Sequence, residues 1–312
     1  MDTPDVLVLG GGGTLGEAWM SALLAGIDES TRFDARACGC YVGTSAGSIV
    51  AASLVAGLAP DARLGAVSPV PTRGDERATQ GSSGASLRQA FGGVGDLAEA
   101  AAAPLASLAL ASSARGGALL RRSILRAVPR GQRSLAELGR MVEQAGVSWD
   151  GRLRIVALEL DSGRRVVFGA PGAPKVSVAL AVEASCAVPG VFRPVRASGR
   201  TYIDGGAWSP TNLDAVEADR GARVLCLNPT GSLRPAAASL AGALGPFSRG
   251  LAGTEALALR RRGAHVTTVN PDATSATAMG INLMDASRRQ AVIDAGRAQG
   301  RELAAQEQRR AA

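Results

Sequence analysis

A serine between two glycines is the first candidate for chemistry in this sequence. Ser45 lies in the run Gly43-Thr44-Ser45-Ala46-Gly47, with an apolar stretch on each side. A nucleophilic hydroxyl must stand clear of a sheet edge on a sharp turn, and only small neighbours such as Gly43 and Gly47 permit that turn. A helix following the turn would direct its positive amino-terminal end to where negative charge develops. The pattern therefore predicts a nucleophile, although an ordinary glycine-rich turn has the same composition.

A nucleophilic serine needs a base, and His265 is the sole histidine of the chain. The order Ser45, Asp204, His265 matches that of an α/β-hydrolase triad. That fold places several strands before its nucleophile, whereas only about two fit before Ser45. His265 also begins a strand-like run, which favours a structural role. A carboxylate that acts directly on the serine is the preferred alternative.

Asp204 is the carboxylate that best fits this role. It ends the apolar stretch 201–203 and is followed by Gly205. If its strand points the same way as the strand before Ser45, both residues lie at the carboxyl edge of a parallel sheet, where open α/β sheets bind ligands. The alternative is a common Asp-Gly turn. We expect Asp204 to be the base.

A second glycine-rich turn follows the first strand at positions 10–13. Free backbone N–H groups in such a turn can hold an oxyanion. A competing interpretation exists, because Gly11, Gly13 and Gly16 also satisfy the GxGxxG pattern of dinucleotide-binding folds. That pattern expects an acidic residue at the end of the second strand, whereas Asp34 comes before that strand. The dinucleotide interpretation is weakened and stays open.

The order strand, glycine turn, helix occurs twice near the amino terminus and predicts an α/β sheet. Between about 66 and 131 the sequence becomes a low-complexity insertion, which ends in a basic amphipathic pattern at about 119–133. This pattern predicts either an interfacial lid with arginines toward lipid phosphates or a solvated helix packed on the domain. The other expected elements are strands at 6–9, 37–42, 201–203, 224–227 and 265–269, a hairpin at 154–160 and 166–168, and helices at 14–24, 46–58, 176–187 and 285–308.

Composition narrows the classes of function. The chain has 312 residues and a net charge of +7, with Lys175 as the only lysine. The charge favours an anionic partner, but base composition of the genome explains an arginine bias equally well. Four cysteines without a CxxC pair, together with one histidine, argue against a zinc site. No signal peptide or membrane span is evident, so we expect a cytoplasmic protein without a metal, a cofactor or a nucleic-acid partner.

Four ordered blocks resemble the patatin-like phospholipase family. The sequence is similar to that family in a glycine block at 9–16, the GxSxG block at 43–47, the block ASCAVPGVFRPV at 184–195, and the Asp-Gly-Gly of 204–206 with Asn212 shortly after. The glycine motifs are individually common, whereas their order and spacing together with the third block are distinctive. The resemblance covers most of the chain outside the insertion and the carboxyl-terminal helix.

The resemblance implies a serine acyl hydrolase with a Ser–Asp dyad, in which Ser45 is acylated and Asp204 is the base. The N–H groups of Gly11, Gly12 and Gly13 would form the oxyanion hole. Gly43, Gly47 and Gly205 would support the two motifs. Asn212 is expected to cap or orient the loop after Asp204 and has no chemistry assigned.

The same resemblance implies a single domain over 1–312. Its fold is a three-layer α/β/α sandwich with a largely parallel central sheet and a lid-like insertion. The implied substrate is an acyl lipid. Peripheral contact with an anionic membrane surface is expected only under the lid interpretation of the basic stretch at about 119–133. One departure stands out, because the family usually has Arg or Lys where this chain has Leu15. A catalytically silent lipid-binding relative is therefore a further alternative.

Overall fold

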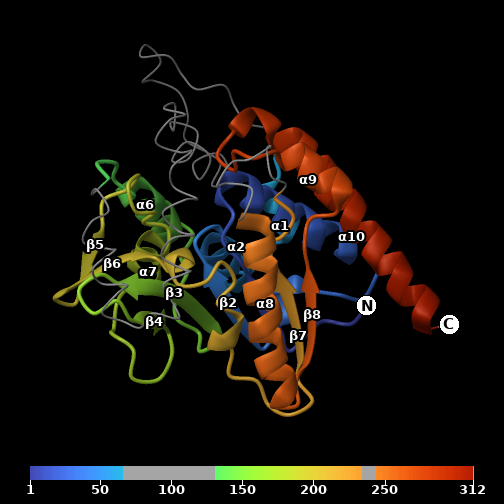
Figure 1. Cartoon of the computed structure of the whole chain (residues 1–312), viewed down its shortest axis with the longest axis horizontal. Helices are drawn as coiled ribbons and strands as arrows, with labels where there is room; N and C mark the ends of the chain where they lie inside the picture. Colours follow the sequence, from blue (N-terminus) through green and yellow to red (C-terminus); the bar gives the residue numbers. More distant parts are fainter. Residues whose placement is uncertain (66–130, 234–243, 312) are drawn as a thin grey trace.

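The computed structural model describes residues 1–65, 131–233 and 244–311. The insertion expected at about 66–131, and all but the last residues of its amphipathic stretch, lie outside the described residues. Eight strands form one sheet with the order β5-β6-β3-β2-β1-β7-β8, and β4 also pairs with β3 (Figure 1). The strands are β1 (Val6–Leu9), β2 (Cys40–Thr44), β3 (Leu153–Glu159), β4 (Arg165–Phe168), β5 (Val195–Ala197), β6 (Arg200–Asp204), β7 (Arg223–Leu227) and β8 (His265–Val269).

Five consecutive strands of the sheet, β3, β2, β1, β7 and the edge strand β8, are parallel to one another. Antiparallel pairing is confined to β4, β5 and β6, beside β3. The expected hairpin is confirmed by the pairing of β3 with β4. The helices are α1 (Gly13–Asp28), α2 (Ala46–Val55), α6 (Ala136–Gln144), α7 (Val178–Ser185), α8 (Leu244–Arg261), α9 (Ala273–Met279) and α10 (Arg289–Ala311). Of these elements α6, α8, α9 and β5 were not expected from the sequence.

Alternation along the strands divides the core between the two faces of the sheet. In β1, Leu7 and Leu9 belong to the large cluster with α1, α2 and α7, whereas Val6 and Val8 belong to a smaller cluster with α8. A strand with apolar side chains on both faces needs helices on both faces, which gives the three layers. The expected α/β/α sandwich with a largely parallel sheet is confirmed.

Close packing of α10 on α1 joins the two ends of the chain. A Cβ at Gly26 of α1 would collide with the Arg297 carbonyl, and a Cβ at Gly300 of α10 would collide with the Leu23 carbonyl. Glycine at these positions lets the two backbones approach closely. Trp19 is fully buried and donates a hydrogen bond of 2.9 Å to Gln299, as expected for a core residue.

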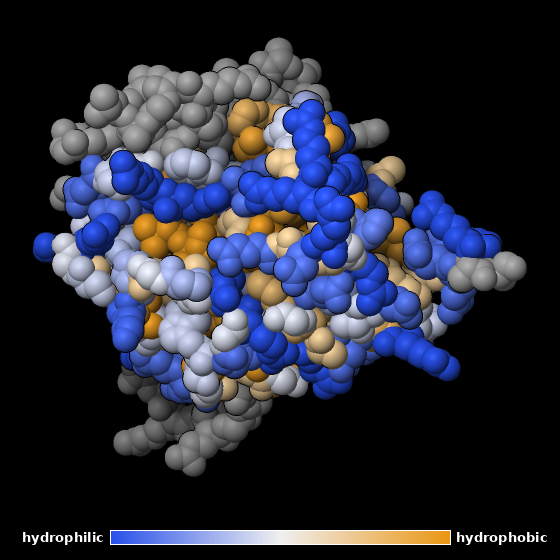
Figure 2. All heavy atoms as spheres, turned by 90° about the horizontal axis from the view of Figure 1, so that it is seen from below, coloured by the Kyte–Doolittle hydropathy of each residue, from blue (hydrophilic) through white to orange (hydrophobic). Residues whose placement is uncertain are grey.

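The face of the described part that is shown in Figure 2 is mostly hydrophilic. Figure 2 shows a face on which hydrophilic side chains surround separate hydrophobic areas. The large apolar residues exposed among the described ones are Leu58, Leu257 and Ile281. None of the described helices combines the length and the apolar character that crossing a bilayer requires.

Candidate active site

The register of β3 brings Ser45 and Asp204 together. Thr44 at the end of β2 pairs with Val156, and Asp204 at the end of β6 pairs with the next residue, Ala157. Because β2 is parallel to β3 and β6 is antiparallel to it, the two strands meet end to end along β3. The sequence argument assumed strands with the same direction. Their directions are opposite, and the two residues meet because both strands terminate at adjacent positions of β3.

Ser45 occupies a strained turn between β2 and α2. Its φ of 51° and ψ of −122° lie in a region that residues other than glycine rarely adopt. A Cβ at Gly47 would collide with the Leu9 carbonyl, and a Cβ at Gly43 would press on the backbone of Ser48. Both flanking glycines are therefore required by close backbone contacts. The helix α2 begins at Ala46, so its positive end adjoins the serine.

Asp204 is a buried carboxylate. The residue is 3% exposed, and its carboxylate accepts a hydrogen bond of 2.6 Å from the Gly206 amide. The Ser45 side chain lies close enough to lower the pKa of this carboxyl. Burial raises its pKa to about 6, although the neighbouring Ser45 side chain and the Gly206 amide lower it. A Cβ at Gly205 would collide with the Val156 carbonyl, which explains the glycine after the aspartate. An aspartate with a pKa near neutrality next to a serine hydroxyl is suited to proton transfer.

Ser185, in the third block, supports the turn at Ser45 through hydrogen bonds. Its hydroxyl accepts a hydrogen bond of 2.9 Å from the Ser45 amide and donates one of 2.6 Å to the Val156 carbonyl. In the same block, the Ala187 carbonyl accepts from the Asp204 amide at 3.0 Å. Sequence reasoning gave this block a packing role and did not single out Ser185. The only available signal was a serine within a distinctive motif.

Asn212 joins the two turns. Its side-chain amide donates to the Thr44 hydroxyl at 3.1 Å, to the Gly205 carbonyl at 3.1 Å and to the Ser209 carbonyl at 2.6 Å. It is fully buried. The expectation that it orients the loop after Asp204 captured part of this arrangement, because Asn212 also holds the residue that precedes Ser45.

The glycine loop lies beside the serine, and two of its three expected donors are available. A Cβ at Gly11 would lie 3.4 Å from the Ser45 Cβ. The Gly11 amide, however, donates a hydrogen bond of 2.8 Å to the Pro210 carbonyl. Within the described part of the chain, the amides of Gly12 and Gly13 make no intramolecular hydrogen bond. The predicted oxyanion hole stays a prediction, and the amides of Gly12 and Gly13 are the two of its three groups that have no acceptor within the described residues.

The alternative sites are not assembled. His265 is the first residue of β8 and pairs with Arg223, the first of β7, so it lies at the opposite edge of the parallel strands from Ser45. Asp34 caps a 3₁₀ turn (Ala35–Ala37) before β2 and bonds Arg36. It is therefore also far from the carboxyl edge, where a ribose would bind. Neither the histidine triad nor the dinucleotide site is supported by these positions.

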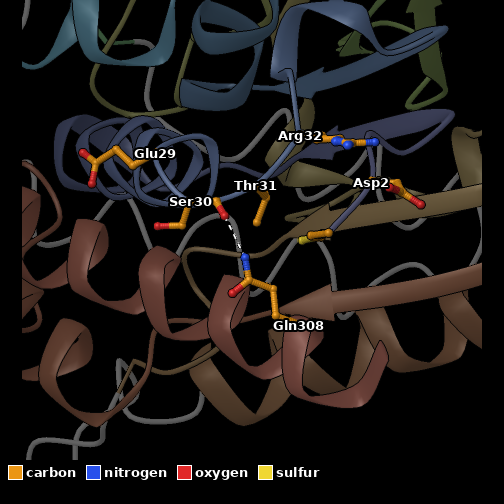
Figure 3. Close-up of a pocket in the computed structure, with 7 residues that line it drawn as sticks. Asp2, Glu29, Ser30, Thr31, Arg32 and Gln308 are labelled. Carbon is orange, nitrogen blue, oxygen red and sulfur yellow. Dashed lines mark hydrogen bonds between the residues drawn. The ribbon is translucent and has the colours of Figure 1, made fainter. Parts of the chain in front are cut away.

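Two further observations on the described residues concern metal ligands and a surface pocket. Residues 1–65, 131–233 and 244–311 contain no group of three or more His, Cys, Asp or Glu side chains placed to hold a metal ion. A surface pocket of about 420 Å³ lies near the end of α1, and none of its lining residues belongs to the predicted site (Figure 3). It is lined by Met1, Asp2, Glu29, Ser30, Thr31, Arg32 and Gln308.

This chain is similar to a protein family and to a solved structure. A family model described as patatin-like phospholipase matches this range, which includes Ser45, Asp204 and the glycine loop. Among solved structures, the crystal structure of VipD from Legionella pneumophila is similar over 97% of this chain and 67% of that chain, with 14% sequence identity and a TM-score of 0.40.

Proposed function

The chain belongs to the patatin-like phospholipase family, and from this premise we propose that it hydrolyses carboxylic esters of acyl lipids with Ser45 as nucleophile and Asp204 as base. Family membership indicates a lipid acyl hydrolase. The dyad and the ester class are the parts that we propose. The observation that carries the proposal is the convergence at β3: the strained Ser45 turn, beside a helix amino terminus, and the buried Asp204 carboxylate follow strands that end at the adjacent positions Val156 and Ala157.

The first half of the reaction forms an acyl-enzyme. Asp204 accepts the hydroxyl proton as the Ser45 oxygen bonds to the ester carbonyl carbon, and the carbonyl oxygen becomes an oxyanion. The amides of Gly12 and Gly13 donate to that oxyanion, supported by the positive end of α1. The tetrahedral intermediate then breaks its bond to the leaving alkoxide, which takes the proton from Asp204.

The second half releases the acyl group. Water attacks the acyl-enzyme carbonyl and gives a proton to Asp204, and a second oxyanion forms at the same amides. Collapse breaks the bond to Ser45, whose oxygen recovers the proton from Asp204. Ser185 and Asn212 act as positioning residues in both halves because they hold the two turns and touch no reacting atom.

The test is labelling with a fluorophosphonate probe, followed by mass-spectrometric mapping of the modified residue. We expect label on Ser45, no label in Ser45→Ala, and slow labelling in Asp204→Asn. Hydrolysis of p-nitrophenyl esters should be lost in both variants and retained in His265→Asn, the matched control. Label elsewhere, or loss of activity only in the histidine variant, would refute the dyad. A chain that binds anionic vesicles without any label would instead be a silent lipid-binding relative.

A further inference from the structure

A buried cluster of three charged residues lies behind the glycine loop. Glu17 of α1 accepts a hydrogen bond of 2.7 Å from Arg63 and another of 2.7 Å from Arg289, the first residue of α10. Glu17 and Arg289 are 6% and 8% exposed. Burial would raise the pKa of Glu17, but the two guanidinium groups outweigh it and the pKa lies below its usual value. The carboxylate is therefore charged.

The cluster carries an excess of positive charge. Its two arginines share one carboxylate, and their remaining hydrogen bonds go to neutral oxygens. Arg63 donates to the Ser53 hydroxyl at 2.9 Å, and Arg289 donates to the carbonyl of Arg63 at 2.9 Å. Among the described residues, neither arginine pairs with a second acid. Within the described part of the chain, the cluster thus has one more cationic than anionic group, in a place from which water is largely excluded.

The positive charge of Arg289 lies near the amino-terminal ends of α1 and α10. Arg289 begins α10, and its guanidinium donates to the Thr14 carbonyl in the first turn of α1 at 3.3 Å. A cation near the amino-terminal end of a helix is unfavourable because that end is already positive. The positive ends of the two helices thus add to the positive potential of the cluster, and the Glu17 carboxylate, bonded to Arg289 at 2.7 Å, offsets it.

The segment before α10 holds the same turn. The Leu283 carbonyl accepts hydrogen bonds from the Leu15 amide at 3.0 Å and from the Thr14 hydroxyl at 3.1 Å. A Cβ at Gly13 would lie 2.7 Å from the Met284 sulfur. The stretch 283–289 thus contacts and hydrogen-bonds the first turn of α1, although it lies outside the residues 7–216 matched by the family model.

Residue 15 cannot supply a positive charge here. Leu15 is fully buried in the main hydrophobic cluster. We infer that Arg289 is a positioning residue which, with Glu17 and Arg63, fixes the glycine loop and places a positive charge behind the Gly12 and Gly13 amides. Its kinetic consequence rests on the proposed function, because only an oxyanion at those amides would gain from the charge.

The test compares Arg289→Gln with Arg301→Gln. Arg301 also joins α10 to α1, through a bond of 2.6 Å to Glu29 at the far end of α1, so it is a matched control for loss of an interhelical ion pair. In Arg289→Gln we expect kcat for p-nitrophenyl esters to fall about tenfold with KM nearly unchanged. Affinity for a trifluoromethyl ketone, which forms a tetrahedral adduct with serine, should fall in parallel. Arg301→Gln should change none of these.

Hydrogen exchange provides a readout that does not depend on activity. The peptide that contains residues 12–16 should exchange faster in Arg289→Gln and at the wild-type rate in Arg301→Gln. Unchanged exchange in Arg289→Gln, or an equal effect of both variants, would overturn the inference. Faster exchange with unchanged kcat and inhibitor affinity would overturn its electrostatic part.

Two further outcomes stay interpretable. If Arg289→Gln does not fold, Arg289→Lys replaces it. Lysine keeps the positive charge, but its ammonium group cannot bond all three acceptors of the Arg289 guanidinium. Hydrogen exchange of residues 12–16 should therefore become faster, while kcat falls less than tenfold. Wild-type kcat in that variant together with unchanged exchange would again overturn the inference. If the wild-type protein neither hydrolyses esters nor labels at Ser45, the proposed function fails, whereas the exchange comparison still decides whether Arg289 holds the loop.

Discussion

The side-chain amide of Asn212 donates a hydrogen bond of 3.1 Å to the Thr44 hydroxyl, 168 residues earlier in the chain. The same nitrogen donates to the Gly205 carbonyl at 3.1 Å. Thr44 precedes the proposed nucleophile and Gly205 follows the proposed base, so one buried amide fixes the distance between the two turns. The backbone of Asn212 has a φ of 49°, a left-handed conformation that asparagine tolerates better than most residues.

Asn212→Gly isolates the contribution of this side chain. Glycine accepts the left-handed backbone, so the variant removes the amide without adding strain. Three buried oxygens lose a donor, and we expect roughly 3 kcal/mol of destabilisation in urea unfolding. In addition to any activity lost because part of the protein is unfolded, kcat of the folded variant should fall about tenfold with little change of KM. Asn212→Ala adds the strain and should be less stable still, and a wild-type kcat in folded Asn212→Gly would show that the amide has no positioning role.

Ser185→Ala tests the support of the serine turn. The substitution leaves the buried Ser45 amide and the Val156 carbonyl without their partner, at a cost of about 2 kcal/mol by chemical unfolding. Ser48→Ala is the matched control, because the Ser45 carbonyl that its hydroxyl bonds also accepts from the Ser48 amide at 2.8 Å. We expect kcat to fall more in Ser185→Ala than in Ser48→Ala, and the reverse order would contradict the assignment.

Gly47→Ala tests the steric requirement of the GxSxG turn. The added methyl group would collide with the Leu9 carbonyl, and because both partners are backbone, relief requires α2 to shift away from β1. We expect a loss of about 3 kcal/mol or more in the free energy of unfolding. Gly250→Ala in α8 meets open space and should instead stabilise by about 1 kcal/mol, since alanine favours helix. Equal stability of the two variants would refute the close contact.

Local sequence patterns predicted the elements that carry the site. A strand, a glycine-flanked serine and a helix are encoded within a few residues, and so is the Asp-Gly turn at the end of β6. The direction of β6 could not be read in this way. It depends on pairing with β3, and an apolar run such as 201–203 has the same pattern in either direction.

Contacts between distant parts of the chain were also hidden. Asn212 meets Thr44, and Arg289 meets Glu17, across more than 160 residues, and no periodicity marks such pairs. The hydrogen bond of the Gly11 amide could not be predicted for the same reason, because its acceptor, the Pro210 carbonyl, comes from the loop after Asp204. The sequence predicted which residues could react, and among the residues that hold them it indicated part of the role of Asn212 but not Ser185 or Arg289.

The pH dependence of ester hydrolysis should follow Asp204. Acylation requires the carboxylate, and burial raises its pKa to about 6. We therefore expect log kcat/KM to be level above about pH 7 and to fall with unit slope below about pH 6. The measurement is a pH profile under conditions where the protein stays folded, with His265→Asn as a control that keeps the same midpoint. A profile without a midpoint between about pH 5 and pH 7 would argue against Asp204 as the base.

Asp204→Asn should stabilise the fold while it abolishes hydrolysis. The folded-state pKa of about 6 lies above the ordinary value of 3.8, so the folded protein favours the protonated form. The stability associated with this group is fully present below about pH 4 and is lost as the pH rises through about 6, a difference of about 3 kcal/mol. Asparagine mimics the protonated form and keeps acceptors for Ser45 and Gly206.

Urea unfolding at about pH 4 and pH 8 checks the sign. The variant should match the wild type at the lower pH and exceed it at the higher pH. Asp285→Asn is the opposite control: a hydrogen bond from Ser287 lowers the pKa of Asp285, so its carboxylate contributes stability at neutral pH that is lost on acidification, and its replacement should destabilise at pH 8. If Asp204→Asn were instead less stable than the wild type at pH 8, the buried carboxylate would be a structural anchor, and its charged form would not be the destabilised, proton-accepting state that the raised pKa indicates.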